Sequence, residues 1–138
     1  RTWCAVIGVG VAQRCIDEAV AYSKQRVQFG KPICKNQAIQ FKIADMEIRT
    51  EASRQLIAHS IRLADMGLPF SKESAAAKCF AGDSVMQTAI DAVQILGGYG
   101  YSREYPVEKL MRDAKIFQIF EGTNEIQRMV VGRTVISK

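Results

Sequence analysis

The chain contains only three prolines among its 138 residues, and each lies between stretches whose apolar residues recur with a helical period. Proline is excluded from helix interiors because it lacks an amide N–H and its ring clashes with the preceding turn. Alternating β-branched residues over the length of a strand are absent, so helices dominate the pattern. The chain is therefore predicted to be all-α.

Four long helices and one short helix are predicted between these breaks. The long helices cover residues of about 3–25, 37–66, 71–96 and 123–136, and the short one covers about 106–115. Residues 26–36 form a connector with Gly30 and Pro32, and no strand is expected. Ser71 and Thr123 are the expected N-caps. Because the connections are short, we expect an up-down four-helix bundle with one short extra helix.

The composition is that of an ordinary globular protein. Apolar residues make up 48% and charged residues 24%, which is too apolar for a disordered chain. The net charge of +5 would suit an anionic partner. The basic residues are spread over every segment and aromatics are only 8%, so no nucleic-acid surface is expected. No apolar run approaches the roughly 18 residues of a membrane span.

The cysteines and the single histidine exclude an obvious metal site. Cys4, Cys15, Cys34 and Cys79 contain no Cys-x-x-Cys pair, and His59 is the only histidine. We expect four reduced thiols and no bound metal. The chain does not begin with methionine and enters an apolar pattern without a capping residue, so it is expected to be a piece of a longer protein.

The stretch from residue 94 to residue 127, QILGGYGYSREYPVEKLMRDAKIFQIFEGTNEIQ, carries the residues most suited to chemistry. Glu121 follows an apolar run and precedes a glycine. A carboxylate among apolar groups loses solvation and becomes a stronger base. The alternative is a solvated turn residue, favoured there by the N-terminus of the following helix.

Other residues could meet a phosphate group. The glycines from Gly97 to Gly100 could let a backbone approach one, although a helix C-cap and turn explains them equally. No strand precedes them, so neither the dinucleotide fingerprint nor the P-loop applies. Arg26 could pair with a phosphate or be a solvated connector residue. Gln37 and Gln94, at a helix start and a helix end, could be simple surface residues.

The 94–127 stretch closely resembles the C-terminal signature of the acyl-CoA dehydrogenases. Residues 26–46, RVQFGKPICKNQAIQFKIADM, resemble the connector and second bundle helix of the same family. Family members have an N-terminal helical domain, a middle β domain and a C-terminal four-helix bundle. The resemblance covers the whole chain and implies that residues 1–138 are the last domain alone. It also implies oxidation of acyl-CoA thioesters to trans-2-enoyl-CoA with FAD.

The resemblance assigns roles around the Glu-Gly-Thr motif. Glu121 matches the catalytic base, which removes the α-proton of the substrate while the β-hydride goes to the flavin. Gly122 lets the thioester pass close to the main chain, and Arg1 aligns with an arginine near the acyl-CoA site. Thr123 and Glu125 match positions that contact the flavin of the same subunit.

A second set of matching positions contacts the FAD of a neighbouring subunit. Arg26, Gln37, Gln94 and Gly98 belong to this set, with Arg26 near the pyrophosphate. Phe29 matches the aromatic residue of an Arg-x-x-Phe-Gly motif near the same cofactor. FAD sites shared in this way imply a homo-oligomer, a dimer or a tetramer.

The resemblance also bears on substrate class, electron acceptor, compartment and the activity of the isolated chain. The glutamate at position 121 places the chain in the short- and medium-chain straight-acyl branch, and electron-transfer flavoprotein would accept the electrons. The expected compartment is the cytoplasm of a bacterium or the mitochondrial matrix of a eukaryote. The isolated 138 residues are expected to be inactive. The alternative function is a helical interaction or oligomerisation module that keeps the scaffold without catalysis.

Overall fold

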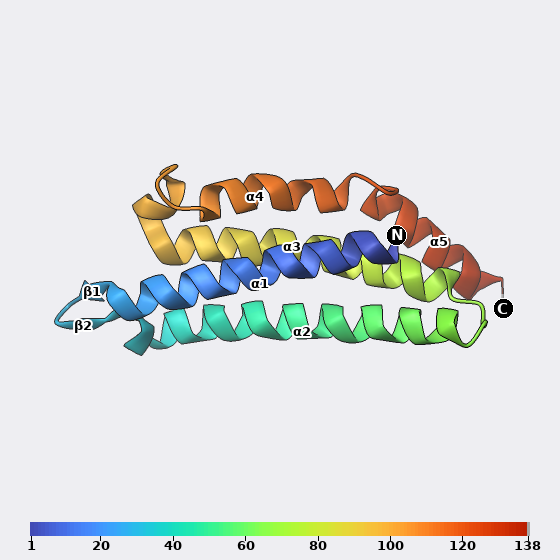
Figure 1. The fold of residues 1–138 in the computed structure, drawn as a ribbon, viewed down its shortest axis with the longest axis horizontal. Helices are drawn as coiled ribbons and strands as arrows, with labels where there is room; N and C mark the ends of the chain where they lie inside the picture. Colours follow the sequence, from blue (N-terminus) through green and yellow to red (C-terminus); the bar gives the residue numbers. More distant parts are fainter. Residues whose placement is uncertain (138) are drawn as a thin grey trace.

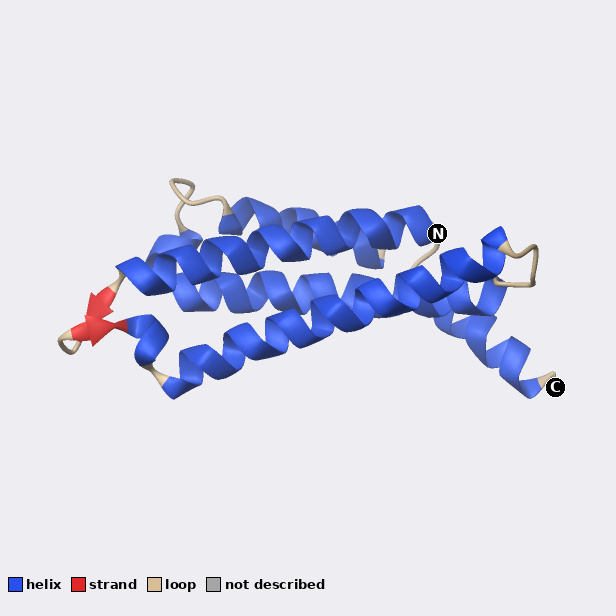
Figure 2. Ribbon diagram, turned by 60° about the horizontal axis from the view of Figure 1, so that its bottom comes forward, coloured by secondary structure: helices blue, strands red, loops and turns tan. Residues whose placement is uncertain are grey.

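A computed structural model describes residues 1–137 and confirms the all-α fold (Figure 2). The helices are α1 (Thr2–Gln25), α2 (Gln37–Asp65), α3 (Ser71–Leu96), α4 (Val107–Lys115) and α5 (Asn124–Ile136). Short 3₁₀ helices lie between them: η1 (Ile33–Lys35), η2 (Gly97–Tyr101) and η3 (Ile116–Gln118).

The chain reverses direction at each connection from α1 to α4, so these four helices form the predicted up-down bundle (Figure 1). The short helix α4 takes the fourth position, because it packs against both α3 and α1. The longer α5 packs against α3 at one end of the bundle and is the additional helix. The short helix α4 is therefore the fourth helix of the bundle and the last helix α5 is the extra one, the reverse of the assignment expected from helix length.

Helix α3 lies at the centre and packs against α1, α2, α4 and α5. Its buried face is rich in small residues, mainly alanine, serine and glycine, which allows neighbouring helices to approach closely. Larger apolar side chains fill the spaces between helices, among them Met46 of α2, Val85 of α3 and Phe117 of η3. Burying a side chain of this size stabilises the fold by about 1.5–3 kcal/mol.

The connector between α1 and α2 contains a small hairpin that the sequence did not predict. Strands β1 (Val27–Gln28) and β2 (Lys31–Pro32) pair antiparallel. Between them, Phe29 and Gly30 have φ values of 52° and 78°. A two-residue turn with both φ values positive matches the twist of the paired strands. The expectation of no strand is thus wrong at this one place.

The two predicted N-caps have different outcomes. Thr123 caps α5, and its hydroxyl accepts a hydrogen bond from the N–H of Ile126 at 3.4 Å. Ser71 is not a cap, because α3 already includes it. The carbonyl of Phe70 accepts the N–H of Ser74 at 2.8 Å, which makes Phe70 the N-cap without any side-chain bond.

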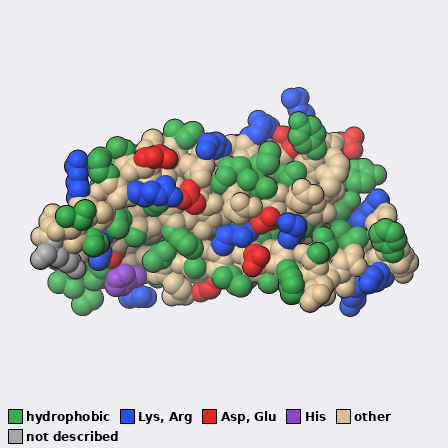
Figure 3. All heavy atoms as spheres, turned by 180° about the vertical axis from the view of Figure 1, so that it is seen from behind, with side chains coloured by type: hydrophobic (Ala, Val, Ile, Leu, Met, Phe, Trp, Pro, Cys, Tyr) green, Lys and Arg blue, Asp and Glu red, His purple; other side chains and the backbone are tan. Residues whose placement is uncertain are grey.

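The bundle leaves large apolar side chains on its surface. Phe41 and Ile48 of α2 are 60% and 65% exposed, so this apolar stripe faces away from the chain's own core. Figure 3 shows such hydrophobic groups interleaved with charged ones on one face of the molecule. Within the described residues, no helix combines the length and apolarity needed to cross a membrane.

Candidate active site

Backbone strain marks two positions in the described chain. Phe29 and Glu121 are its only residues other than glycine with positive φ, and Glu121 has φ 58°. Each is followed by a glycine that also has positive φ, Gly30 or Gly122. A left-handed conformation costs a side-chain-bearing residue about 1–2 kcal/mol, and such strain concentrates at functional sites. Both positions are among the residues that the sequence analysis selected.

The turn between η3 and α5 brings together the candidates from the two ends of the chain. The backbone nitrogen of Arg1 lies 4.0 Å from Oε2 of Glu121. Figure 1 shows the N-terminus beside the junction of α4 and α5. Gly122, Thr123 and Glu125 follow directly, so five sequence-predicted site residues lie in one small region.

Glu125 remains charged at the start of α5. A backbone hydrogen bond at the helix N-terminus and the hydroxyl of Thr123 lower its pKa below the ordinary value of 4.5. Its side chain is exposed. The carboxylate therefore adds negative charge to the rim of the site at neutral pH.

The chain does not itself shield Glu121 from water, contrary to the sequence expectation. The side chain is 61% exposed. The preceding apolar residues Ile119 and Phe120 are also exposed. A dry environment for this carboxylate requires groups other than the described residues to cover the turn.

Three buried polar side chains hold this turn from beneath, and the sequence analysis missed them. Nζ of Lys78 donates hydrogen bonds to the carbonyl oxygen of Gly122 at 2.8 Å and to Oδ1 of Asn124 at 2.9 Å. Nε2 of Gln127 donates to the carbonyl oxygens of Glu121 and Gly122 at 3.2 and 3.0 Å. All three side chains are almost completely buried. Lys78 had a detectable signal, since it interrupts a run of small residues on the inward face of α3.

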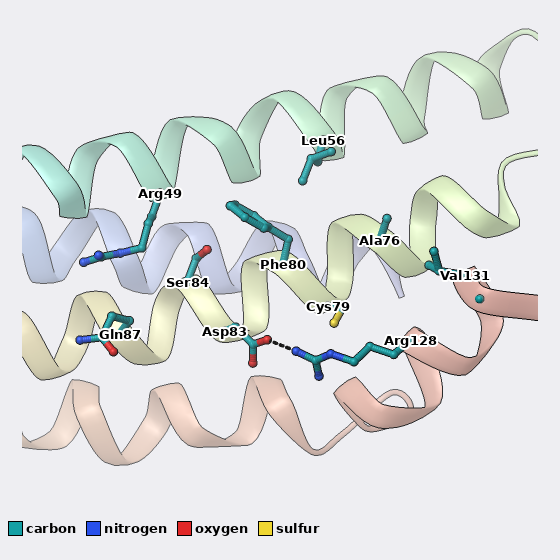
Figure 4. A pocket seen from close by; sticks show the side chains of 11 residues that line it. Arg49, Leu56, Ala76, Cys79, Phe80, Asp83, Ser84, Gln87, Arg128 and Val131 are labelled. Carbon is teal, nitrogen blue, oxygen red and sulfur yellow. Dashed lines mark hydrogen bonds and ion pairs between the residues drawn. The ribbon is translucent and has the colours of Figure 1, made fainter. Parts of the chain in front are cut away.

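Asp83 connects the same network to α5. Its carboxylate accepts hydrogen bonds from Gln118 at 2.7 Å, Asn124 at 2.8 Å and Arg128 at 2.5 Å. Burial opposes ionisation of Asp83, but these hydrogen bonds outweigh it and lower its pKa below the ordinary 3.8. The Asp83–Arg128 pair ties α3 to α5 (Figure 4). The network therefore fixes the end of the bundle that carries Glu121.

Two cavities lie near this end of the bundle, and they differ in their relation to the predicted site. A groove of about 800 Å³ between α2, α3 and α5 contains Phe80 and Arg128, but none of the sequence-predicted residues (Figure 4). A second cavity of about 960 Å³ is lined by Arg1 together with Ser60 and Phe70. Arg1 is thus the only sequence-predicted site residue that lines either of these two cavities.

The other candidates lie at the opposite end of the bundle. Arg26 and Gly98 line a cavity of about 500 Å³. The guanidinium carbon of Arg26 is 5.7 Å from the ring centre of Tyr99, a cation–π arrangement that orients it. No atom lies within 4 Å of the position that a side chain on Gly98 would take. A fixed cation beside open backbone fits an anionic group such as a pyrophosphate.

The remaining candidates of this end do not line that cavity. Phe29 is 96% exposed at the tip of the hairpin. Gln37 is the first residue of α2, Gln94 lies in the last turn of α3, and both are exposed. The structure therefore places these three at the same end as Arg26, outside the lining of the cavity beside it.

The two groups of candidates are separated by the length of α1. Its 24 residues span about 36 Å. Arg1 lies at one end of this helix and Arg26 at the other.

Among the described residues, no cluster of three or more His, Cys, Asp or Glu side chains is placed to hold a metal ion.

Comparison with known proteins gives one family. The sequence model for "Acyl-CoA dehydrogenase, C-terminal domain" matches residues 1–136. An acyl-CoA dehydrogenase of Bacillus subtilis (strain 168) is 52% identical over 136 residues, which are 99% of this chain and 36% of that protein.

Solved structures have the same fold over almost the whole chain. The butyryl-CoA dehydrogenase of Megasphaera elsdenii is 51% identical with a TM-score of 0.97, covering 99% of this chain and 36% of its own. A chain in a structure of the electron transferring flavoprotein of Acidaminococcus fermentans is 48% identical with a TM-score of 0.98, covering 100% and 36%. The chain thus spans about a third of the length of the proteins it matches.

Proposed function

The chain belongs to the acyl-CoA dehydrogenase family, and we propose that residues 1–138 are the C-terminal domain of a longer FAD-dependent enzyme. This enzyme converts acyl-CoA thioesters to trans-2-enoyl-CoA. The domain supplies Glu121 as the base, part of the FAD site and a surface for oligomerisation. Substrates are short- and medium-length straight acyl chains.

One observation carries this proposal: Glu121 presents an exposed carboxylate from a strained turn that buried side chains hold in place. Exposure in this chain leaves the carboxylate accessible to a substrate. The rigid turn fixes its position, which a general base needs for efficient proton transfer. Arg1 and Gly122 beside it form the expected surroundings of the thioester.

In this mechanism the carboxylate of Glu121 accepts the α-proton of the acyl-CoA. Negative charge then develops on the thioester oxygen and requires hydrogen-bond donors. Within the described residues no backbone carbonyl accepts the N–H of Glu121, so this N–H is available to that oxygen. Gly122 carries no side chain that would obstruct the approach. FAD, when bound, supplies the acceptor for the hydride that leaves the β-carbon.

The two ends of the domain serve two FAD molecules. Thr123 and Glu125 contact the flavin of the same subunit, next to Glu121. Arg26, together with Phe29, Gln37, Gln94 and Gly98, contacts the FAD of a neighbouring subunit, with Arg26 at the pyrophosphate. The separation of about 36 Å along α1 supports this division, because the two groups lie at opposite ends of that helix.

Sharing of the cofactor requires a homo-oligomer, a dimer or a tetramer. Phe41 and Ile48, two turns apart on the same face of α2, are large apolar side chains left exposed, and their burial at an interface supports such an assembly. Analytical ultracentrifugation of the full-length enzyme tests it, and a monomer at high concentration would contradict it.

Electron-transfer flavoprotein is the proposed electron acceptor, and the compartment is the bacterial cytoplasm or the mitochondrial matrix.

The decisive experiment is Glu121→Gln in the full-length enzyme. The amide keeps the size of the side chain but cannot accept the proton, so bound FAD is retained while kcat falls by at least about 10²-fold. Bleaching of the flavin by acyl-CoA thioesters of increasing chain length measures the reaction. The matched control is Glu104→Gln, an exposed glutamate before α4, which leaves the rate unchanged.

Wild-type turnover in Glu121→Gln would remove Glu121 from the role of base. Absence of flavin bleaching by every acyl-CoA, even in the wild-type enzyme, would favour a non-catalytic interaction module instead. The isolated 138 residues are expected to show no acyl-CoA oxidation with added FAD.

A further inference from the structure

Lys78 is the largest side chain that the bundle buries almost completely, with 1% of its surface exposed. Both of its hydrogen-bond partners, the carbonyl of Gly122 and the side-chain oxygen of Asn124, are uncharged. Burying an amine in this way costs several kcal/mol unless its hydrogen bonds are satisfied. The proposed reaction gives this residue no direct part, so its position requires another explanation.

The bonds from Lys78 and Gln127 set the orientation of two successive peptide groups. The carbonyl oxygens of Glu121 and Gly122 both point inward, towards these buried donors. In a trans peptide the N–H of the next residue points opposite to the carbonyl. The N–H groups of Gly122 and Thr123 therefore point outward, and no backbone carbonyl of the described residues accepts them.

We propose that Lys78, assisted by Gln127, is a positioning residue that holds the Glu121–Gly122 turn so that the carboxylate of Glu121 faces the substrate. This inference rests on the proposed function of Glu121 as base. The donors offset the strain of the left-handed conformation at Glu121, which a free turn would relieve by rotating these peptides. Lys78 acts from α3 and does not contact the substrate.

Two replacement side chains of equal length distinguish a positioning role of Lys78 from a role in filling space. Lys78→Met removes the donor, whereas Lys78→Gln ends in an amide N–H₂ at the position of the methionine methyl group. If Lys78 only fills space, methionine is the better replacement, because a buried amide without good partners is costly. If Lys78 positions the turn, glutamine gives the higher kcat. The two roles therefore predict opposite orders of activity.

In the full-length, FAD-loaded enzyme, Lys78→Met is expected to lower kcat by about 10²-fold with KM for the acyl-CoA unchanged. Lys78→Gln is expected to recover a few-fold of this loss, because its amide is one bond shorter than the lysine amine and reaches the Gly122 carbonyl only after a small shift of the turn towards α3. Lys109→Met, an exposed lysine of α4, is the control and leaves kcat unchanged. Equal kcat for the methionine and glutamine variants would overturn the inference.

A readout independent of turnover is the crystal structure of the Lys78→Met variant. The inference expects the Gly122 carbonyl to have rotated away from α3, and an unmoved turn would overturn it. Should Lys78→Met not fold, Gln127→Met removes the other donor of the turn. A wild-type kcat in Gln127→Met would then overturn the inference.

The inference and the proposed function fail in different ways. If Glu121→Gln abolishes turnover while Lys78→Met reacts at the wild-type rate, only the positioning role is wrong. If Glu121→Gln retains the wild-type rate, the base has been misassigned whatever Lys78 does.

Discussion

Gly82 of α3 lies directly beneath the main chain of Phe117 in η3. A Cβ atom at residue 82 would be 2.7 Å from the carbonyl oxygen of Phe117 and 3.1 Å from the side chain of Asn124. The absence of a side chain at this one position lets η3 rest on the central helix. The segment that leads to Glu121 is therefore located by backbone contact rather than by side-chain packing alone.

Gly82→Ala is predicted to destabilise the protein by about 1–3 kcal/mol, the usual cost of inserting a methyl group into a packed interior. The nearest obstructing atom, the carbonyl oxygen of Phe117, belongs to the backbone and cannot turn aside, so η3 must shift. Chemical unfolding measures the free energy. Because the shift reaches the turn at Glu121, kcat is expected to fall as well.

The control for this substitution is Gly132→Ala in α5. Nothing lies within 4 Å of an added Cβ there. Alanine favours a helix over glycine by up to about 1 kcal/mol, so Gly132→Ala is neutral or stabilising. A Gly82→Ala protein as stable as Gly132→Ala would contradict the close approach of η3 to α3.

Gly122→Ala is predicted to impair both stability and turnover. Gly122 has φ 88°, and an added Cβ would lie 2.5 Å from Nε2 of Gln127, which holds the turn. Gly67→Ala, in the loop between α2 and α3, imposes a similar conformational penalty at φ 67° without any contact within 4 Å. Both variants should lose about 1 kcal/mol through the backbone. Only Gly122→Ala should also lose kcat, and equal kcat in the two variants would contradict the role of this turn.

The buried amine of Lys78 predicts a dependence of stability on pH. Burial disfavours the ammonium form and lowers the pKa of Lys78 below its ordinary value of 10.5. Between the lowered pKa and 10.5, the unfolded chain binds a proton that the folded chain has released. The free energy of unfolding therefore rises with pH across this window, and the gain is lost as pH falls below the lowered pKa.

Urea unfolding of the wild-type protein and of Lys78→Met, from about pH 7 to about pH 10, isolates this effect. The difference in unfolding free energy between wild type and variant should shift in favour of the wild type as pH rises. A difference that stays constant with pH would show that Lys78 titrates alike in the folded and unfolded chains.

The thiols should differ in reactivity. Burial, with a smaller effect from Glu18, raises the pKa of Cys15 to about 12. Only the thiolate attacks alkylating reagents, so Cys15 should resist iodoacetamide in the folded protein at about pH 8. Mass spectrometry of native and urea-unfolded samples measures the modification. Rapid labelling of Cys15 in the native sample would contradict its burial.

Much of the architecture could be predicted from the chain alone. The positions of the prolines and the helical period gave the helices within a few residues, and short connections gave the antiparallel order. The hairpin at Phe29 could not be predicted, because each strand has only two residues and no alternation can show in so short a segment. The prediction that Ser71 is the N-cap of α3 was wrong, because a hydroxyl near the start of a helix does not decide which residue begins the helix.

The candidate site was predicted in part. The Glu-Gly-Thr motif and Arg1 were selected from the sequence, and the structure places them together. Lys78, Asn124 and Gln127 were not selected, because a polar residue in a helix is usually solvated and its burial depends on the neighbouring helices. The shielding of Glu121 was expected from apolar residues adjacent in sequence, but the two that directly precede it, Ile119 and Phe120, are themselves exposed.

The sequence by itself determined the helices, through their helical period, and the family of this protein, through the resemblance of contiguous stretches to a known family, because both are properties of neighbouring residues. Tertiary structure alone decided which helix completes the bundle, which side chains lie beneath Glu121 and how far that residue is from Arg26. These relations join residues distant in sequence, and they arise only when the helices pack and bury particular faces against one another.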